Sequence, residues 1–374
     1  MRGKIRLGDT ATFVNGYPFK PETWTETGLP IIRIQNLNNP EAPYNHYFGS
    51  VPEKYLVRRG DILISWSASL GAYEWKGDDA YLNQHIFKVV FDKSPIDKHY
   101  LRYAVESKLA EMEKDAHGAT MRHIVKKDFD NTLIPYPPFQ EQEKIVAELD
   151  CLSGIIEKKK VQLEELDKLA QSIFYDMFGD PITNEKGWPV KKLGSFSNSE
   201  LGKMLDVKKN KGELRPYLCS INVQWGRFEL NPLKQMGFEN DELERYSVRK
   251  GDLLICEGGD TGRCAIWKED YTIYYQNALH RVRFDEKVML PIVCQFVMKA
   301  YKDNGEMDKY SKGQTIKHLV KKTLLSIPMI APPLGLQNEF AQKIEAIERQ
   351  KDLVKRSIVE TETLFNSRMD YWFN

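Results

Sequence analysis

The chain has 374 residues, a length typical of two or three domains rather than one. Hydrophobic residues make up 41% and charged residues 29%, which is a soluble globular composition. Because 54 basic residues nearly cancel 53 acidic ones, the composition excludes a polybasic membrane anchor and an acidic disordered chain. No apolar run approaches the ~20 residues of a membrane helix, and the first residues lack the apolar stretch of a signal peptide. We therefore expect a cytoplasmic protein whose five scattered cysteines are reduced thiols.

Residues 1–140 are expected to form a first globular domain. Short apolar runs bounded by Gly, Asn and Pro, such as 31–34, 62–65 and 85–91, are typical of strands. Asn15-Gly16 is a turn signal, and one helix is expected around Lys98–Lys114. The pattern predicts a mixed α/β domain dominated by a twisted sheet.

Residues 141–179 are expected to form one long helix. Apolar positions from Ile145 onward recur in alternating steps of four and three, the heptad pattern of a coiled coil. About 38 residues correspond to roughly 57 Å of helix. The helix should end at Gly179-Asp180-Pro181, since glycine can adopt a left-handed cap and proline cannot continue a helix. The alternative is an ordinary amphipathic core helix.

Residues 180–335 are expected to contain a linker and a second copy of the first domain. Segment 55–64 returns as 246–255, and segment 118–127 returns as 313–322. A shift that stays between 186 and 195 residues indicates one duplicated fold with small loop insertions. A helix around Leu290–Lys302 matches the helix expected in the first copy. The predicted fold class is therefore α+β, with two duplicated mixed α/β domains.

Residues 336–374 are expected to form a second long helix that separates the two domains together with the first as an antiparallel coiled-coil pair. Lys159 and Lys351 interrupt the apolar seams, which favours a specified pair over a promiscuous homodimer. The predicted helix-pairing residues are Ile145, Leu149, Leu152, Ile156, Leu163, Leu166, Phe340, Ile344, Ile347, Val354, Ile358 and Phe365.

Basic charge gathers in the globular copies. Segment 141–178 has nine acids and five bases, and segment 336–374 has seven acids and six bases. The helices therefore carry −5, and the remainder carries +6 against a chain total of +1. A local basic face is what binding to a phosphate backbone requires, although solvated surface lysines alone could produce this modest excess.

Both copies carry the pattern Gly-x-Thr-x-(Arg/Lys)-His followed by Lys-Lys. A glycine beside a hydroxyl and two cations can hold a phosphate through backbone N–H, hydroxyl and charge. A glycine-bearing turn that feeds a buried element explains the pattern equally well. The predicted DNA phosphate-binding residues are Thr120, Arg122, Lys126, Lys127, Thr315, Lys317, Lys321 and Lys322.

Polar residues that differ between the copies are candidates for reading bases. Amide and arginine side chains can pair with base edges, and a carboxylate can accept from cytosine. The alternative is that most of them are ordinary loop and turn polars. The base-reading candidates are Asn36, Asn38, Trp66, Ser67, Asn83, Gln84, Asn222, Gln224, Glu257, Arg263, Gln276 and Asn277.

Known catalytic signatures are absent from the sequence. It contains no GxxxxGK[ST] phosphate loop, no GxSxG elbow and no HExxH metal motif. Asp252 with Glu257 lacks the following lysine of a nuclease metal pair. We expect no catalytic residue and no metal in this chain.

The motif combination resembles the specificity subunit of type I restriction-modification systems. The resemblance rests on segment 59–64, on segment 126–138 with Gln140-Glu141-Gln142, and on segment 174–181. The second-copy counterparts match, as far as 364–369, so the resemblance covers essentially the whole chain.

The resemblance implies a non-catalytic DNA reader with two target-recognition domains, each reading one half of a bipartite site on double-stranded DNA. It further implies that two methyltransferase (modification) subunits dock on the helices and that restriction (endonuclease/translocase) subunits join the complex. S-adenosylmethionine, ATP and magnesium would be used by those partners.

The long helices agree with such a division of labour. A rod of about 57 Å exceeds one B-DNA turn of roughly 34–36 Å, so we expect a gapped target. Because the two copies differ, we expect unlike half-sites. Two other classes stay open: a self-contained methyltransferase or nuclease fused to its reader, and an assembly scaffold built on the coiled coil.

Overall fold

The structure is a computed structural model that describes residues 3–67, 69–114, 124–206, 210–311 and 318–374. The chain divides into two compact units, and each combines one globular domain with part of both long helices. Unit 1 comprises residues 1–160 and 356–374, and unit 2 comprises residues 161–355. The predicted α+β fold class is confirmed, although each domain is built from several small sheets rather than one.

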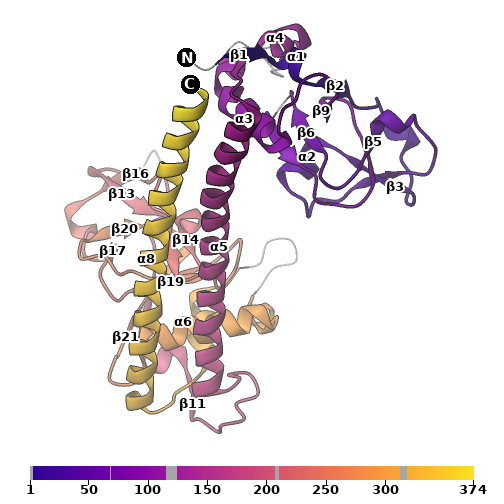
Figure 1. Ribbon diagram of the computed structural model, residues 1–374. Helices are drawn as coiled ribbons and strands as arrows, with labels where there is room; N and C mark the ends of the chain where they lie inside the picture. The colour runs from indigo at the N-terminus through magenta and orange to yellow at the C-terminus, as the bar shows by residue number, and fades with distance from the viewer. Residues whose placement is uncertain (1–2, 68, 115–123, 207–209, 312–317) are drawn as a thin grey trace. The chain divides into compact units, whose positions relative to one another are not determined.

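Unit 1 begins with a domain of ten short strands and four helices (Figure 1). Its strands are β1 (Lys4–Arg6), β2 (Thr12–Asn15), β3 (Leu29–Ile32), β4 (Asn45–Tyr47), β5 (Leu56–Val57), β6 (Ile62–Ser65), β7 (Gly71–Glu74), β8 (Ala80–Leu82), β9 (Ile86–Val90) and β10 (Leu133–Pro135). Its helices before the long one are α1 (Leu7–Thr10), α2 (Ile34–Asn38), α3 (Lys98–Lys114) and α4 (Lys126–Asn131), with α3 where the sequence predicts it.

Two four-stranded sheets form the body of this domain, in the orders β2-β9-β6-β7 and β4-β3-β8-β5. Strands β3 and β8 pair in parallel, and the other neighbours pair antiparallel. The ribbon β1-β10 joins the start of the domain to its end, with Ile5 opposite Ile134. One face of the first sheet packs on α3 through buried residues that include Ile64, Phe87 and Tyr100.

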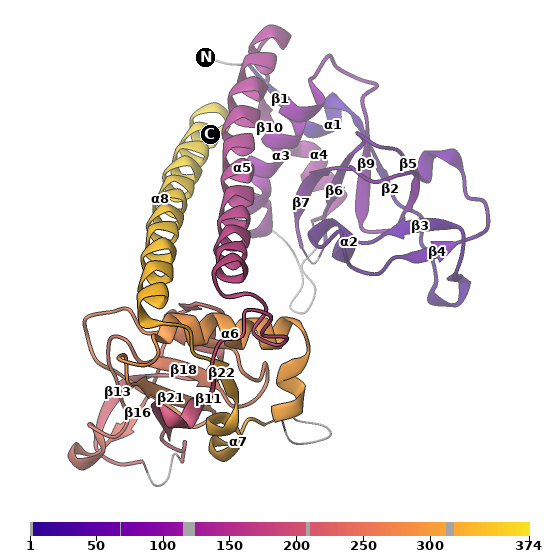
Figure 2. The same ribbon diagram turned by 90° about the horizontal axis from the view of Figure 1, so that it is seen from below.

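Unit 2 contains a domain of twelve strands and two helices (Figure 2). Its strands are β11 (Val190–Lys192), β12 (Ser197–Leu201), β13 (Glu213–Leu218), β14 (Val223–Gln224), β15 (Arg227–Phe228), β16 (Lys234–Phe238), β17 (Ser247–Val248), β18 (Leu253–Cys256), β19 (Cys264–Ile266), β20 (Ile273–Tyr275), β21 (Leu279–Phe284) and β22 (Pro328–Ile330). Its two helices are α6 (Pro291–Asp303) and α7 (Lys321–Ser326).

The sheets of unit 2 repeat the topology of unit 1. Their orders are β12-β21-β18-β19 and β16-β13-β20-β17, and β13 pairs with β20 in parallel as β3 does with β8. The ribbon β11-β22 corresponds to β1-β10. The hairpin β14-β15 is an addition with no counterpart among the strands of unit 1. The two domains are therefore copies of one fold.

The long helices are α5 (Phe139–Phe178) and α8 (Leu334–Phe373), each 40 residues and so about 60 Å long. Each starts after a Pro-Pro pair, and a buried glutamine one turn later fixes it to its own domain. Gln142 Nε2 donates to Pro137 O at 2.9 Å, and its Oε1 accepts from Asp97 N at 2.9 Å. Gln337 makes the same contacts with Pro332 O and Leu290 N, both at 2.8 Å.

The two long helices pair antiparallel within each unit. In unit 1, Arg368 and Trp372 near the end of α8 contact Glu148 near the start of α5. In unit 2, the ring of Phe340 lies 5.8 Å from that of Phe174 and 5.1 Å from that of Phe178. These contacts join the beginning of one helix to the end of the other.

Three further features concern the described residues. No helix among them is long and apolar enough to cross a membrane. No group of three or more metal-ligating side chains gathers in this part of the chain. All five cysteines are free, and all but Cys151 are buried.

Candidate nucleic-acid interface

In unit 1, three connections meet at one end of the strands. Tyr17 N donates to Leu82 O at 2.8 Å, and Gln84 N donates to Tyr17 O at 3.0 Å. Trp66 N donates to His85 O at 3.3 Å. We name segments 15–17, 65–67 and 83–85 junction 1.

Unit 2 repeats this arrangement bond for bond. Lys203 N donates to Tyr275 O at 3.1 Å, and Asn277 N donates to Lys203 O at 2.7 Å. Glu257 N donates to Ala278 O at 2.9 Å. We name segments 201–203, 256–258 and 276–278 junction 2. The same backbone therefore presents different side chains in the two copies.

Glycines allow the connections to meet this closely. A Cβ on Gly16 would lie 1.9 Å from Asn83 O, and one on Gly202 would lie 2.2 Å from Gln276 O. Both contacts are with backbone, which cannot rotate away as a side chain can. The turns are also tight at His85 and Ala278, with φ of 73° and 82°.

The junctions contain more than half of the base-reading candidates. Their shared property is a position on a turn at the end of a strand, with at most part of the side chain buried except at Ser67. They are Trp66, Ser67, Asn83 and Gln84 in junction 1, and Glu257, Gln276 and Asn277 in junction 2.

Junction 1 is aromatic and rigid. The Trp66 ring stacks on Phe87 with centroids 5.6 Å apart, and its Nε1 donates to Asn15 Oδ1 at 3.2 Å. Asn83 Oδ1 and His85 Nδ1 are buried and have no hydrogen-bond partner among the described residues. Buried polar atoms normally have partners, so these two are candidates for contact with a ligand.

Junction 2 is polar and charged. Lys203, which occupies the place of Tyr17, is buried, donates to Gly237 O at 2.8 Å and pairs with Glu242. Burial would raise the pKa of Glu242, but the hydrogen bond from Lys203 lowers it overall. Asn277 Oδ1 accepts from Ala278 N at 2.5 Å. The two junctions therefore offer different chemistry at equivalent positions.

Four predicted phosphate-binding residues lie outside the described residues: Thr120, Arg122, Thr315 and Lys317. The chain after each undescribed segment is bonded to a junction. Ile124 N donates to Trp66 O at 3.0 Å, and Leu319 N donates to Glu257 O at 2.7 Å.

The two Lys-Lys pairs begin the short helices α4 and α7, and all four side chains are exposed. The first lysine of each pair has an acidic partner: Lys126 lies 2.9 Å from Asp130, and Lys321 lies 3.3 Å from Glu200. The second lysines, Lys127 and Lys322, make no ion pair with any residue in the described part of the chain. They are the cations best placed to meet a phosphate.

Asn36 and Asn222 have a structural role instead. Asn36 Oδ1 accepts from Arg33 N at 3.1 Å, and its Nδ2 donates to Ala42 O at 3.2 Å. Asn222 is bonded in the same way to Cys219 N and Glu229 O, and both asparagines are buried. Because folding uses both ends of each amide, we correct the sequence interpretation and remove them from the base-reading set.

The other candidates away from the junctions are partly used by local contacts. Asn38 Oδ1 accepts from Tyr73 Oη at 2.8 Å, and Gln224 Nε2 donates to Ile221 O at 3.0 Å. Arg263 donates to Ser220 O at 3.0 Å. No described contact brings these three side chains into a junction.

His280 was missed by the sequence reasoning. It is buried on β21, and its Nε2 lies 2.7 Å from Leu319 O, next to the Leu319–Glu257 bond. Burial lowers its pKa, so the ring is neutral near pH 7 and Nε2 carries the donated proton. Its equivalent in the first copy is Phe87, so no repeated motif marked it.

The predicted helix-pairing residues lie between α5 and α8 or at the edge of their contact. Buried members are Ile145, Leu149, Ile156, Phe340, Ile344, Ile347 and Val354, and half-buried members are Leu152, Leu163, Leu166, Ile358 and Phe365. Lys159 Nζ donates to Thr361 Oγ1 at 2.9 Å, and Lys351 lies 2.7 Å from Asp167. Each seam lysine therefore has a partner on the opposite helix.

The family described as the type I restriction modification DNA specificity domain matches residues 3–166 and 185–363. The chain belongs to this family. The match falls on the two copies and confirms the resemblance stated from the sequence.

Homologues of this specificity-domain protein are type I restriction enzyme specificity subunits. It is 23% identical to the EcoBI specificity subunit of Escherichia coli, over 95% of this chain and 81% of the relative. It is 22% identical to the MjaVIII specificity subunit of Methanocaldococcus jannaschii, over 94% of this chain and 87% of the relative.

Solved structures share the fold. The S subunit of a type I restriction-modification system from M. genitalium is 15% identical, with a TM-score of 0.55 over 100% of this chain and 96% of that one. A chain from a study of complex assembly and conformational transition in the type I R-M system is also 15% identical, with a TM-score of 0.60 over 98% and 96%.

Proposed function

We propose that this specificity-domain protein recognises an asymmetric bipartite sequence in double-stranded DNA, with one globular domain for each half-site. The carrying observation is the pair of junctions. Their backbones match bond for bond, yet aromatic Trp66 and Tyr17 stand where Glu257 and Lys203 stand in the other copy. Two readers on one scaffold with different side chains are suited to two different half-sites.

Phosphate contacts would come from Lys127 and Lys322, supported by Lys126, Lys321, Thr120, Arg122, Thr315 and Lys317. The free ammonium groups follow the segments bonded to the junctions, so they would fix the register of a duplex while the junctions read its bases. Cations contribute affinity that depends on salt, whereas junction side chains contribute sequence preference.

We further infer that this chain is not itself an enzyme. It would bring DNA to methyltransferase subunits docked on α5 and α8, and to restriction subunits in a larger complex. S-adenosylmethionine, ATP and magnesium would belong to those subunits. The relatives named as specificity subunits support this inference.

Selection from a random duplex pool tests the proposal. The full chain, assembled with its co-expressed methyltransferase subunits, should enrich two unlike short words separated by a fixed gap. A single contiguous word, or two identical words in inverted orientation, would contradict one half-site per domain. The chain alone should not transfer methyl groups from S-adenosylmethionine or cleave DNA with magnesium. Turnover by the purified chain would show instead a reader fused to its own enzyme.

A further inference from the structure

Unit 2 contains a groove of about 540 Å³ that the DNA-reading proposal does not use. Three helices line it: the second half of α5, the first half of α8, and α6. The turn of the added hairpin β14-β15, at residues 225–227, closes one side. We name this the hairpin groove.

The floor of the hairpin groove is apolar. Phe174 and Ile344 are buried beneath it, and the half-buried rings of Phe296 and Trp225 extend it. Phe296 stacks on Phe174 with centroids 5.5 Å apart. Gly226 N donates to Cys264 O at 3.0 Å, which fixes the hairpin turn to the sheet. The floor is therefore preformed and needs no rearrangement to receive an apolar side chain.

The helices present regularly spaced side chains to the groove. From α6 come positions 292, 295, 296, 299 and 300, and from α8 come 344, 348, 351 and 355. Spacings of three and four residues mean that one face of each helix borders the opening. A groove between helix faces with an apolar floor is the surface that accepts an amphipathic segment of another protein.

The rim of the groove is basic, although α5 and α8 together are acidic. Six bases line it against three acids, Glu164, Asp167 and Glu348. Three of the bases, Arg227, Lys268 and Lys299, come from the globular domain. The acidic excess of the helices therefore lies mostly elsewhere on their surfaces.

The rim cations are available to a partner. Lys168 is exposed and makes no ion pair with a described residue. Lys268, Lys355 and Arg227 pair only with acids across exposed surface, at 3.3, 3.7 and 3.4 Å. Exposed pairs of this kind are weak and can exchange an internal acid for a partner's carboxylate. The internal pairs reduce the net field, so affinity requires the apolar floor as well as charge.

We propose that the hairpin groove binds an acidic amphipathic segment of a partner protein, with apolar side chains on the floor and carboxylates against the rim lysines. This inference rests on the proposed assembly with partner subunits and adds the site and the chemistry of one contact. The hairpin that closes the groove belongs to unit 2, so the contact would distinguish the second domain's partner surface from the first.

Three labelled 16-residue helical peptides test the chemistry against the full chain by fluorescence anisotropy. The first has a Leu/Trp face and a Glu face, the second replaces Glu by Lys, and the third replaces Leu and Trp by Ser. The proposal predicts binding of the first peptide, and at least tenfold weaker binding of the other two. Equal binding of the first and second peptides, or no binding of the first, would overturn it.

Two pairs of charge reversals locate the binding site. Lys168→Glu with Lys355→Glu, one on each long helix at the rim, should weaken the acidic peptide about tenfold or more. Lys158→Glu with Lys343→Glu, exposed on the same helices but outside the groove, should leave its affinity within twofold. Equal effects of both pairs would remove the groove as the site.

A random-sequence duplex and the bipartite selection separate the two proposals. Displacement of the acidic peptide by the duplex, with the same loss in the rim variant, would make the groove a nucleic-acid surface and overturn the peptide proposal. Peptide binding that persists in a chain without bipartite selectivity would refute the DNA-reading proposal alone. Bipartite selectivity without peptide binding would refute the groove proposal alone.

Discussion

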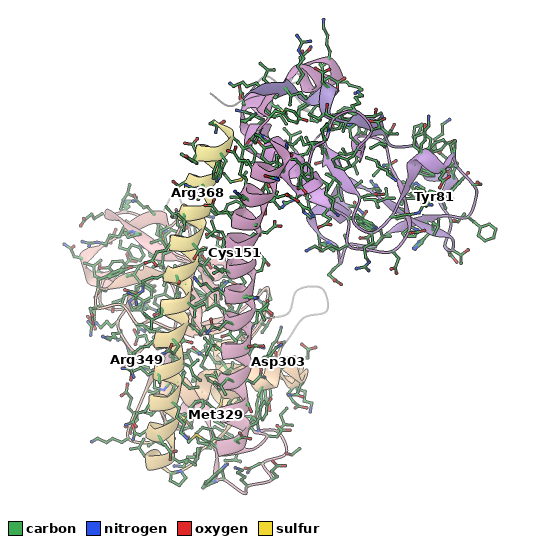
Figure 3. The ribbon with its side chains drawn as sticks, in the orientation of Figure 1. Tyr81, Cys151, Asp303, Met329, Arg349 and Arg368 are labelled. Atoms are coloured by element: carbon green, nitrogen blue, oxygen red, sulfur yellow. The ribbon has the colours of Figure 1, made fainter. Side chains whose placement is uncertain are left out.

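Arg368 on α8 donates to Glu148 on α5, with Arg368 Nη2 3.0 Å from Glu148 Oε2, and so joins residues 220 positions apart (Figure 3). Trp372 Nε1 donates to the same oxygen at 3.1 Å. The hydrogen bond from Arg368 is the main reason that the pKa of Glu148 lies below its ordinary 4.5. The carboxylate therefore binds its proton less readily in the folded chain than in the unfolded chain.

This depressed pKa predicts a dependence of stability on acid. The contribution of Glu148 is fully present above pH 4.5 and is lost as the pH falls below it through the folded pKa. Glu148→Gln should lower the urea midpoint at pH 7 and leave it nearly unchanged at pH 3. The control is Glu157→Gln, since Glu157 pairs only with exposed Lys160 on its own helix. Equal losses at both pH values would contradict the role of charge.

His280 predicts a second pH dependence, in unit 2. Burial lowers its pKa below the ordinary 6.5, so the unfolded chain takes up the proton first as the pH falls. Its contribution to stability is present above pH 6.5 and declines below it. His280→Phe, which copies Phe87 of the first domain, should cost about 1 kcal/mol at pH 7.5 because the bond to Leu319 is lost. The variant should also flatten the pH profile between 6.5 and 5 in urea titrations. An unchanged profile would refute the buried neutral ring.

The junction glycines predict losses of stability and of reading. Gly16→Ala and Gly202→Ala place a methyl group within 2.2 Å of a backbone oxygen, and should each destabilise the chain by about 1–3 kcal/mol. Each should also relax one half-site while the other is kept. Gly154→Ala is the control, because its Cβ meets nothing within 4 Å. On a helix that substitution should stabilise by up to about 1 kcal/mol. Equal behaviour of all three variants in thermal unfolding would contradict the geometry.

The unpaired lysines predict a change in affinity without a change in sequence preference. Lys127→Ala and Lys322→Ala should each weaken binding to every duplex alike and lower the salt slope by about one. Lys158→Ala, an exposed lysine on α5, serves as the control. Binding isotherms at several salt concentrations measure both quantities. An affinity and a slope that match the unchanged chain would show that these lysines do not meet phosphates.

Sequence reasoning predicted the duplication and both long helices, because repeated motifs and heptad spacing are local patterns. It placed the helix at Lys98–Lys114 correctly. It did not predict that each domain splits into two four-stranded sheets, since strand pairing such as β3 with β8 joins segments far apart in the sequence.

The candidate site was predictable only in part. Turn residues after apolar strands marked Asn83, Gln84, Gln276 and Asn277, and the structure brings them into the junctions. The same kind of signal also marked Asn36 and Asn222, whose amides are consumed by hydrogen bonds within their own loops. A sequence shows that an amide is present but does not show whether the fold already uses it.

Mapping of modified bases across the genome of the source cell, with and without this chain, tests the central claim most directly. The account predicts that deleting the chain removes one modified motif made of two unlike words with a fixed gap, and that restoring it with Gln84→Ala relaxes only one word. Loss of a palindromic or ungapped motif, or no loss at all, would contradict a two-domain reader of unlike half-sites.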